Sequence, residues 1–242
     1  MDILYIIGQT KTDELRYSLR SIEKNGINVG RIYVAGYCPS YIRKDMVTFI
    51  EQPDVMAGYK HNNILNCIRQ AVLMSNISNE FLLSSDDHFY VRTTDFNSYP
   101  YFCKGTLQET IENQSDKTAN YSRSIQHTLS FLESKRLPTY NFSFHGNTHF
   151  NRAKFESIIP LVEEAMESEY GVEPSCLMLN SMFADPKYTF QFTERLDLKL
   201  GNLQKDIVGT TREVVSMSDY NYQVCGKQWL RKMFPSPCKY EW

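Results

Sequence analysis

The first half of the chain alternates between short apolar runs and segments whose apolar residues recur at helical spacing, and this pattern constrains the fold most strongly. Apolar runs bounded by small or polar residues are typical of buried strands. Strands that alternate with amphipathic helices predict a parallel sheet with crossover helices. The predicted strands are 3–7, 31–35, 46–50 and 81–84, and the predicted helices between them are 14–25 and 64–72.

The second half of the chain is less regular, and its elements are predicted individually. Strands are predicted over 99–107 and, from alternating residues, over 142–145. A helix is predicted over 152–169, where Pro160 should kink or split it. A further helix is predicted over 174–183. Because neither a repeat nor a linker separates the halves, we expect a single domain.

The composition excludes several broad classes. Apolar residues make up 42% of the 242 residues, enough for a large core, and the net charge of −2 gives no general attraction to nucleic acid or membranes. The six cysteines include no C-x-x-C pair, so we do not expect a zinc site. We expect a cytoplasmic protein whose thiols are reduced. The N-terminus lacks the features of a signal peptide, and no run is long enough to span a membrane.

Two adjacent carboxylates follow the apolar run that ends at Ser84, and they are the strongest functional signal. Asp86 and Asp87 precede His88 and a second apolar run. Burying unpaired charges is costly, whereas carboxylates at a strand end can hold Mg²⁺ or Mn²⁺ against a diphosphate. One carboxylate would bind the metal and the other ribose or sugar hydroxyls. The alternative is a purely structural role, as a solvated strand end or a helix cap.

Three histidines are candidate metal ligands. His88 adjoins the carboxylates, and His145 and His149 lie four residues apart in a segment whose Gly146 favours a turn over a helix. Imidazole is a suitable ligand for Mn²⁺ beside carboxylate oxygens. The alternative for each is an ordinary loop or partly buried histidine.

A second group of residues could contact the diphosphate-bearing ligand of such a metal site. Residues after the first strand and at the start of the helix before the acidic pair would lie at the ligand-binding edge of the sheet, and helix N-termini attract phosphates. Each could equally be a capping or surface residue. These candidates are Gly8, Gln9, Thr10, Arg16, Lys60 and Asn63, together with Asp86.

Residues 13–25, 31–34 and 85–90 resemble the central block of the Stealth proteins, which are sugar-1-phosphate transferases of microbial capsule synthesis. The resemblance covers roughly residues 1–91 and continues weakly at 144–155. It implies an α/β, GT-A-like (Rossmann-like) fold with a mixed, mostly parallel sheet and flanking helices. It also implies a nucleotide-sugar donor, for which we expect a UDP-sugar with Mn²⁺ or Mg²⁺. A His late in the chain, matched here by His145, would join Asp86 and Asp87 as a catalytic residue.

The chain departs from the expected patterns at three points. The family's first block is reduced here to residues 5–9, the arginine that follows the family's His segment has no counterpart near 175–183, and His88 occupies the third position of the D-x-D pattern of GT-A enzymes. The missing arginine favours glycosyl transfer, and a small bacterial or phage GT-A enzyme is the closer match. Two alternatives remain, namely hexose-1-phosphate transfer to a polysaccharide and glycosylation of hydroxymethylated bases in phage DNA. The acceptor would accordingly be a glycan or modified DNA.

The two halves of the domain are expected to divide the work. Residues 1–95 would bind the nucleotide sugar, and residues 96–242 would bind the acceptor. Residues 227–242 form a basic, aromatic tail that would either contact the acceptor or pack on the core. An inverting enzyme also needs a general base, for which the acids within 163–169 and Asp185 are candidates, none of them favoured.

Overall fold

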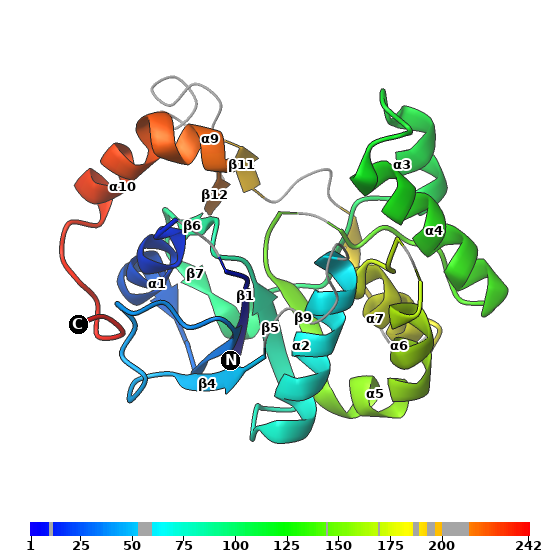
Figure 1. Ribbon diagram of the computed structural model, residues 1–242, viewed down its shortest axis with the longest axis horizontal. Coiled ribbons are helices and arrows are strands. Elements are labelled where there is room, and N and C mark those ends of the chain that lie inside the picture. Colours follow the sequence, from blue (N-terminus) through cyan, green and yellow to red (C-terminus); the bar gives the residue numbers. More distant parts are fainter. Residues whose placement is uncertain are drawn as a thin grey trace.

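A five-stranded sheet with the strand order β4-β3-β1-β5-β9 forms the centre of the molecule (Figure 1). The computed structural model describes residues 1–9, 12–52, 60–143, 145–168, 170–185, 189–192, 197–199 and 213–242. Four strands run parallel and β9 runs antiparallel to β5. The predicted mixed, mostly parallel sheet is therefore confirmed. The strands are β1 (Asp2–Ile7), β3 (Ile32–Gly36), β4 (Thr48–Glu51), β5 (Glu80–Ser84) and β9 (Thr148–Asn151).

Helices cover both faces of this sheet because successive strand residues point to opposite faces. On one face, Ile3 and Tyr5 of β1 pack with Leu19 of α1. On the other face, Leu4 packs with Ile68 of α2. Burying each such aliphatic side chain contributes roughly 1.5–3 kcal/mol. The helices are α1 (Glu14–Asn25) on the first face, and α2 (Lys60–Met74), α5 (Arg152–Ser157), α6 (Ile159–Met166) and α7 (Pro174–Phe183) on the second.

Smaller elements flank the central sheet on both sides (Figure 1). The α3–α4 hairpin projects beyond α7, and the C-terminal helices arch over α1. The helical elements are η1 (Phe96–Ser98), α3 (Leu107–Asn113), α4 (Asn120–Ser134), α9 (Asp219–Asn221), the π-helix η2 (Tyr222–Gly226) and α10 (Lys227–Met233). The short strands are β2 (Gly26–Ile27) with β7 (Thr94–Asp95), β8 (Phe102–Cys103) with β10 (Gln191–Phe192), and β6 (His88–Tyr90) with β12 (Val214–Ser216) and β11 (Asp197–Lys199).

The second half corrects part of the sequence-based prediction. The helix predicted over 152–169 is split at Ile158, next to Pro160, and α7 has the predicted bounds. The strand predicted over 142–145 is wrong for the described residues 142, 143 and 145, and the backbone N–H of Phe142 donates to Cys176 Sγ instead of to a neighbouring strand. Strand β9 begins only at Thr148, and the strand predicted over 99–107 is reduced to the two residues of β8.

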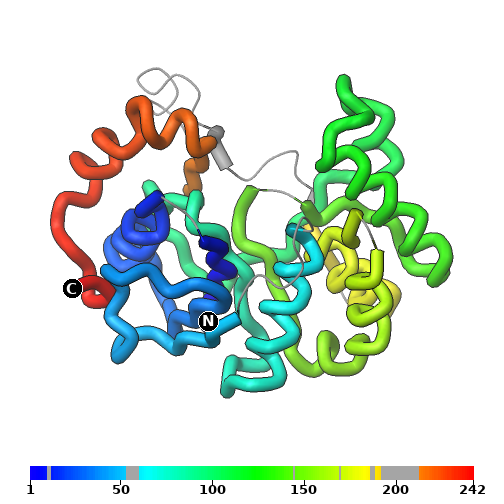
Figure 2. Tube along the Cα trace, in the orientation of Figure 1, coloured from blue at the N-terminus to red at the C-terminus, as the bar shows by residue number. Residues whose placement is uncertain are grey.

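The C-terminal tail packs against α1, as the second alternative for it predicted. Figure 2 shows the last residues returning to the first quarter of the chain. Leu230 and Phe234 pack on Tyr17, and Glu241 accepts hydrogen bonds from Arg20 at 2.6 and 2.8 Å. Among the described residues, no helix combines the length and apolar character that a membrane crossing requires.

Candidate active site

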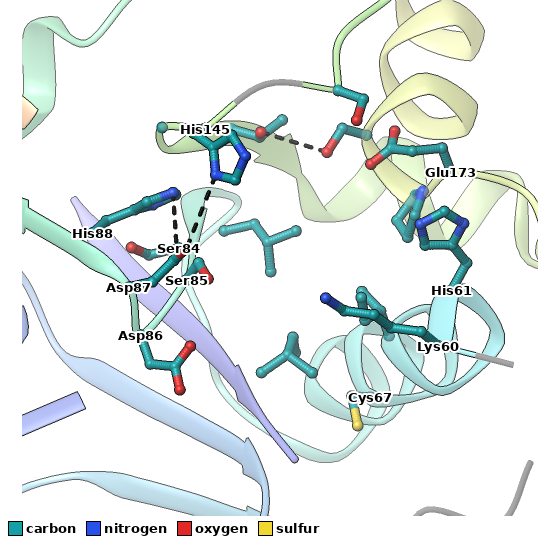
Figure 3. A pocket seen from close by; sticks show the side chains of 18 of the residues that line it. Lys60, His61, Cys67, Ser84, Ser85, Asp86, Asp87, His88, His145 and Glu173 are labelled. Atoms are coloured by element: carbon teal, nitrogen blue, oxygen red, sulfur yellow. Dashed lines mark hydrogen bonds and ion pairs between the residues drawn. The ribbon is translucent and has the colours of Figure 1, made fainter. Parts of the chain in front are cut away.

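A tight turn between β5 and β6 presents the two adjacent carboxylates. Strand β5 ends at Ser84, Asp86 and Asp87 occupy the turn, and the His88 amide donates to the Ser85 carbonyl at 3.3 Å. The turn allows the neighbouring side chains to serve different purposes. Asp87 points toward His88 and His145, whereas Asp86 points away from both imidazoles (Figure 3).

Asp87, His88 and His145 form a group that could hold a metal ion. Asp87 Oδ1 lies 3.6 Å from His88 Nε2, and Asp87 Oδ2 lies 3.9 Å from His145 Nδ1. One ligand atom from each residue lies within 4.8 Å of the others. Three of the four predicted metal ligands are thus brought together by the fold, although they come from a turn and a loop far apart in sequence.

The chemistry of this group fits a transition-metal dication. Asp87 Oδ1 is buried and has no hydrogen-bond partner among the described residues, so a cation would compensate a carboxylate oxygen that is otherwise costly to bury. Two imidazoles and one carboxylate suit Mn²⁺ better than Mg²⁺, which prefers oxygen ligands. The residues present therefore fit the ion expected from the sequence.

Asp86 differs from Asp87 in its electrostatic environment. Burial raises the pKa of Asp86 to about 6, and the charge of Asp87 adds to the shift. The side chain lines the same pocket as the metal-ligand group but lies outside that group. A carboxyl group in this position suits hydrogen bonds to hydroxyls, which is the role predicted for the second acid of the pair.

A pocket of about 920 Å³ extends from the turn to the start of α2 and the N-terminus of α7. This volume falls within the roughly 300–1,000 Å³ usual for small-molecule sites. Lys60 and Asn63 of α2 lie on the wall facing the turn, and Gly8 follows β1 at the same edge. These three predicted donor contacts therefore share a cavity with the metal-ligand group (Figure 3).

The fold does not bring Arg16 or Gln9 into this pocket lining. Arg16 instead forms an ion pair with Glu241 at 3.2 Å and lies 4.4 Å from the centre of the Tyr41 ring. Its position on α1 is as predicted, but a partner from the chain's far end occupies the guanidinium. Thr10 lies outside the described residues.

His149 is separated from the metal-ligand group by the pleat of β9. Thr148 faces the pocket, and His149, which pairs with Leu82, points to the opposite face of the sheet. There it packs between Tyr99 and Tyr101 at ring-centre distances of 6.0 and 4.5 Å. The predicted assignment of His149 as a metal ligand does not fit this placement.

The burial of His149 predicts a measurable pH dependence of stability. Burial lowers the pKa of His149 to about 4, below the ordinary value of about 6.5. Below pH 6.5 the unfolded chain takes up a proton that the folded chain does not, so stability falls as the pH drops toward 4, by at most about 3 kcal/mol. We expect His149→Phe to reduce this loss in urea unfolding at pH 7 and pH 5. Equal losses in both proteins would contradict the expectation.

The pocket also contains residues that the sequence did not single out. His61 and Glu173 line the wall that faces the acidic turn, and Ser175 and Tyr121 also line the pocket. For Glu173 a positional signal existed, because Pro174 is typical of the first position of a helix and places Glu173 at the N-cap. The acids in and directly after α6 that were candidates for the general base, Glu163, Glu164 and Glu167, are exposed and lie outside the pocket lining.

Comparisons with known proteins concern the fold. No protein-family model and no curated protein matches the chain. Among solved structures, an active-site mutant of LgtC matches with a TM-score of 0.53 and 13% identity, over 99% of this chain and 97% of that chain. The galactosyltransferase LgtC in complex with donor and acceptor sugar analogs matches with a TM-score of 0.51, with the same identity and coverage.

The chain has the fold of LgtC. The sheet and its flanking helices match those of GT-A glycosyltransferase structures, which confirms the predicted fold class. At 13% identity, this likeness to LgtC concerns the fold and not the reaction.

Proposed function

We propose that the protein is a metal-dependent glycosyltransferase that moves a sugar from a nucleotide-sugar donor to an acceptor hydroxyl. The observation that carries this proposal is the group of Asp87, His88 and His145 at the carboxyl end of β5, within a pocket of substrate size. In open α/β sheets, ligands bind at that edge. The GT-A-like fold and the donor and acceptor sugar analogs bound to LgtC support the same assignment.

The described side chains suggest how a donor would be held. Asp87, His88 and His145 would hold Mn²⁺, which when bound neutralises charge on a departing diphosphate. Lys60 supplies a positive charge near the start of α2, where helix geometry also favours anions. Asp86 and Asn63 can hydrogen-bond hydroxyl groups of the donor. The nucleotide we propose is UDP.

The pocket also supports the proposed division of the chain. Its acidic turn and α2 wall come from residues 1–95, and the rest of its lining, including His145, comes from residues 96–242. We assign the first part to the donor and the second, apart from His145, to the acceptor. Because the lining mixes Lys60 and Lys104 with three carboxylates instead of forming a basic groove, a glycan acceptor fits better than DNA, whose phosphates demand clustered cations.

Calorimetry and a donor screen test this function. We expect UDP to bind only when Mn²⁺ is present, and one nucleotide sugar to raise the melting temperature and to be slowly hydrolysed. Glycosyl transfer from a UDP-sugar releases UDP, whereas transfer of hexose-1-phosphate releases UMP. Release of UMP would show that the reaction is phosphotransfer and not glycosyl transfer. Failure to bind any nucleotide diphosphate with Mn²⁺ would refute the proposal.

A further inference from the structure

A third carboxylate faces the acidic turn from across the pocket. Among the described residues that line the pocket, Asp86, Asp87 and Glu173 carry carboxylates. Asp86 and Asp87 lie on the β5–β6 turn, and Glu173 lies on the opposite wall at the start of α7 (Figure 3). The pocket therefore places a carboxylate on the side away from the metal ligands.

Several contacts fix the position of Glu173. Its Oε2 accepts a hydrogen bond from the Cys176 amide at 2.6 Å, and its own amide donates to Thr128 Oγ1 at 2.9 Å. Its side chain caps α7. Only 9% of the residue's surface is exposed. These contacts hold the carboxylate at a fixed position on the pocket wall.

The surroundings of Glu173 are suited to hydroxyl groups. His61 lies on the same wall, and its Nδ1 lies 2.5 Å from Ser124 Oγ. Burial lowers the pKa of His61, although the charge of Glu173 opposes the shift, so the imidazole is neutral at pH 7. Ser175 donates to Thr148 Oγ1 at 3.4 Å beside it. A neutral imidazole, hydroxyls and one carboxylate can bind a polyol without repelling it.

If the acceptor oxygen displaces the diphosphate in one step, a base must lie on the side of the sugar where the acceptor binds. The acceptor oxygen must attack the anomeric carbon on the side opposite the departing diphosphate. The metal-ligand group marks the diphosphate side, and Glu173 marks the other.

We propose that Glu173 is the general base of the transfer, an inference that rests on the function proposed above. The acceptor oxygen forms its bond to the anomeric carbon while its proton passes to the Glu173 carboxylate. The bond between that carbon and the diphosphate oxygen breaks, and the diphosphate leaves with the electron pair. The product has the inverted anomeric configuration.

Glu173→Gln tests this role directly, because glutamine keeps the shape and a cap oxygen for the Cys176 amide but cannot take the proton. We expect kcat for transfer to fall at least about 10²-fold, with Mn²⁺ and UDP affinities in calorimetry unchanged. Azide is a nucleophile with no proton to remove. The variant should therefore transfer the sugar to azide about as fast as the wild-type protein transfers it to azide, and the product should be the inverted glycosyl azide. Glu133→Gln, at an exposed position of α4 outside the pocket lining, is the matched control and should behave as wild type.

The possible failures are distinguishable. If E173Q binds Mn²⁺ and UDP, retains its melting temperature and still transfers the sugar at the wild-type rate, Glu173 is not the base. A product with retained configuration would also overturn the assignment, since it requires a different sequence of bond changes. If the wild-type protein itself binds no nucleotide diphosphate, the proposed function has failed instead.

Discussion

Replacing Asp87 with asparagine is expected to reduce sugar transfer by roughly 10³-fold. The amide keeps the size of the side chain but removes the charge that would hold the dication between His88 and His145. A metal ion that neutralises a leaving group contributes several kcal/mol to transition-state stabilisation, and each 1.4 kcal/mol is a factor of ten in rate. Transfer kinetics at saturating donor and a direct titration of Mn²⁺ measure the two consequences.

Two further variants make this test specific. Asp86→Asn should retain Mn²⁺ binding and weaken donor binding, because Asp86 lies outside the metal-ligand group. Asp45→Asn removes an exposed carboxylate that forms an ion pair with nearby Arg43, and should leave transfer unchanged. A folded D87N protein that transfers sugar at the wild-type rate would refute the metal site.

The second large effect is on stability, at the contact between the chain's last residues and α1. Glu241 is fully buried, and Arg20, with 8% of its side chain exposed, binds both carboxylate oxygens. Glu241→Gln would leave the buried guanidinium without its counter-charge, and breaking such a pair costs about 3–5 kcal/mol. Urea unfolding at pH 7 measures the loss. Asp45→Asn, which breaks an exposed pair, should cost at most about 1 kcal/mol.

The same contact predicts how acid affects the protein. Burial alone would raise the pKa of Glu241, but hydrogen bonds from Arg20 and the Cys238 amide lower it below its ordinary value. The folded pKa then lies below the unfolded one, so this stabilisation is present above about pH 4.5 and is lost as the pH falls through the folded pKa. The Glu241→Gln variant should lack this part of the acid sensitivity, and an unchanged acid profile would contradict the assigned pairing.

The parts of the structure that sequence could predict are those governed by neighbouring residues. The strands and helices of the first half follow from local periodicity, and Asp86, Asp87 and His88 occupy the turn expected at a strand end. The remainder depends on contacts between distant segments. Arg16 forms an ion pair with Glu241, which lies at the far end of the chain, and no local pattern indicates this contact.

The second half of the site shows the same limit. The local sequence does not distinguish His145 from His149 as a metal ligand. Because β9 begins at Thr148, His145 lies in the preceding loop beside Asp87, whereas His149 lies in the strand and packs against aromatic rings. Glu173 was not among the candidate bases, because a position at the start of a helix by itself indicates a structural cap and not catalysis. Its role follows only from the wall of the pocket to which α7 brings it.

The antiparallel pairing of β9 with β5 sets the geometry of the site. Phe150 lies opposite Phe81 and the two rings are in contact, so core packing fixes the register of this buried edge strand. A shift of two residues along β5 would carry the preceding loop about 7 Å along the sheet, too far for His145 to remain beside Asp87. The distance between these two metal-ligand candidates therefore depends on aromatic packing beneath the sheet edge.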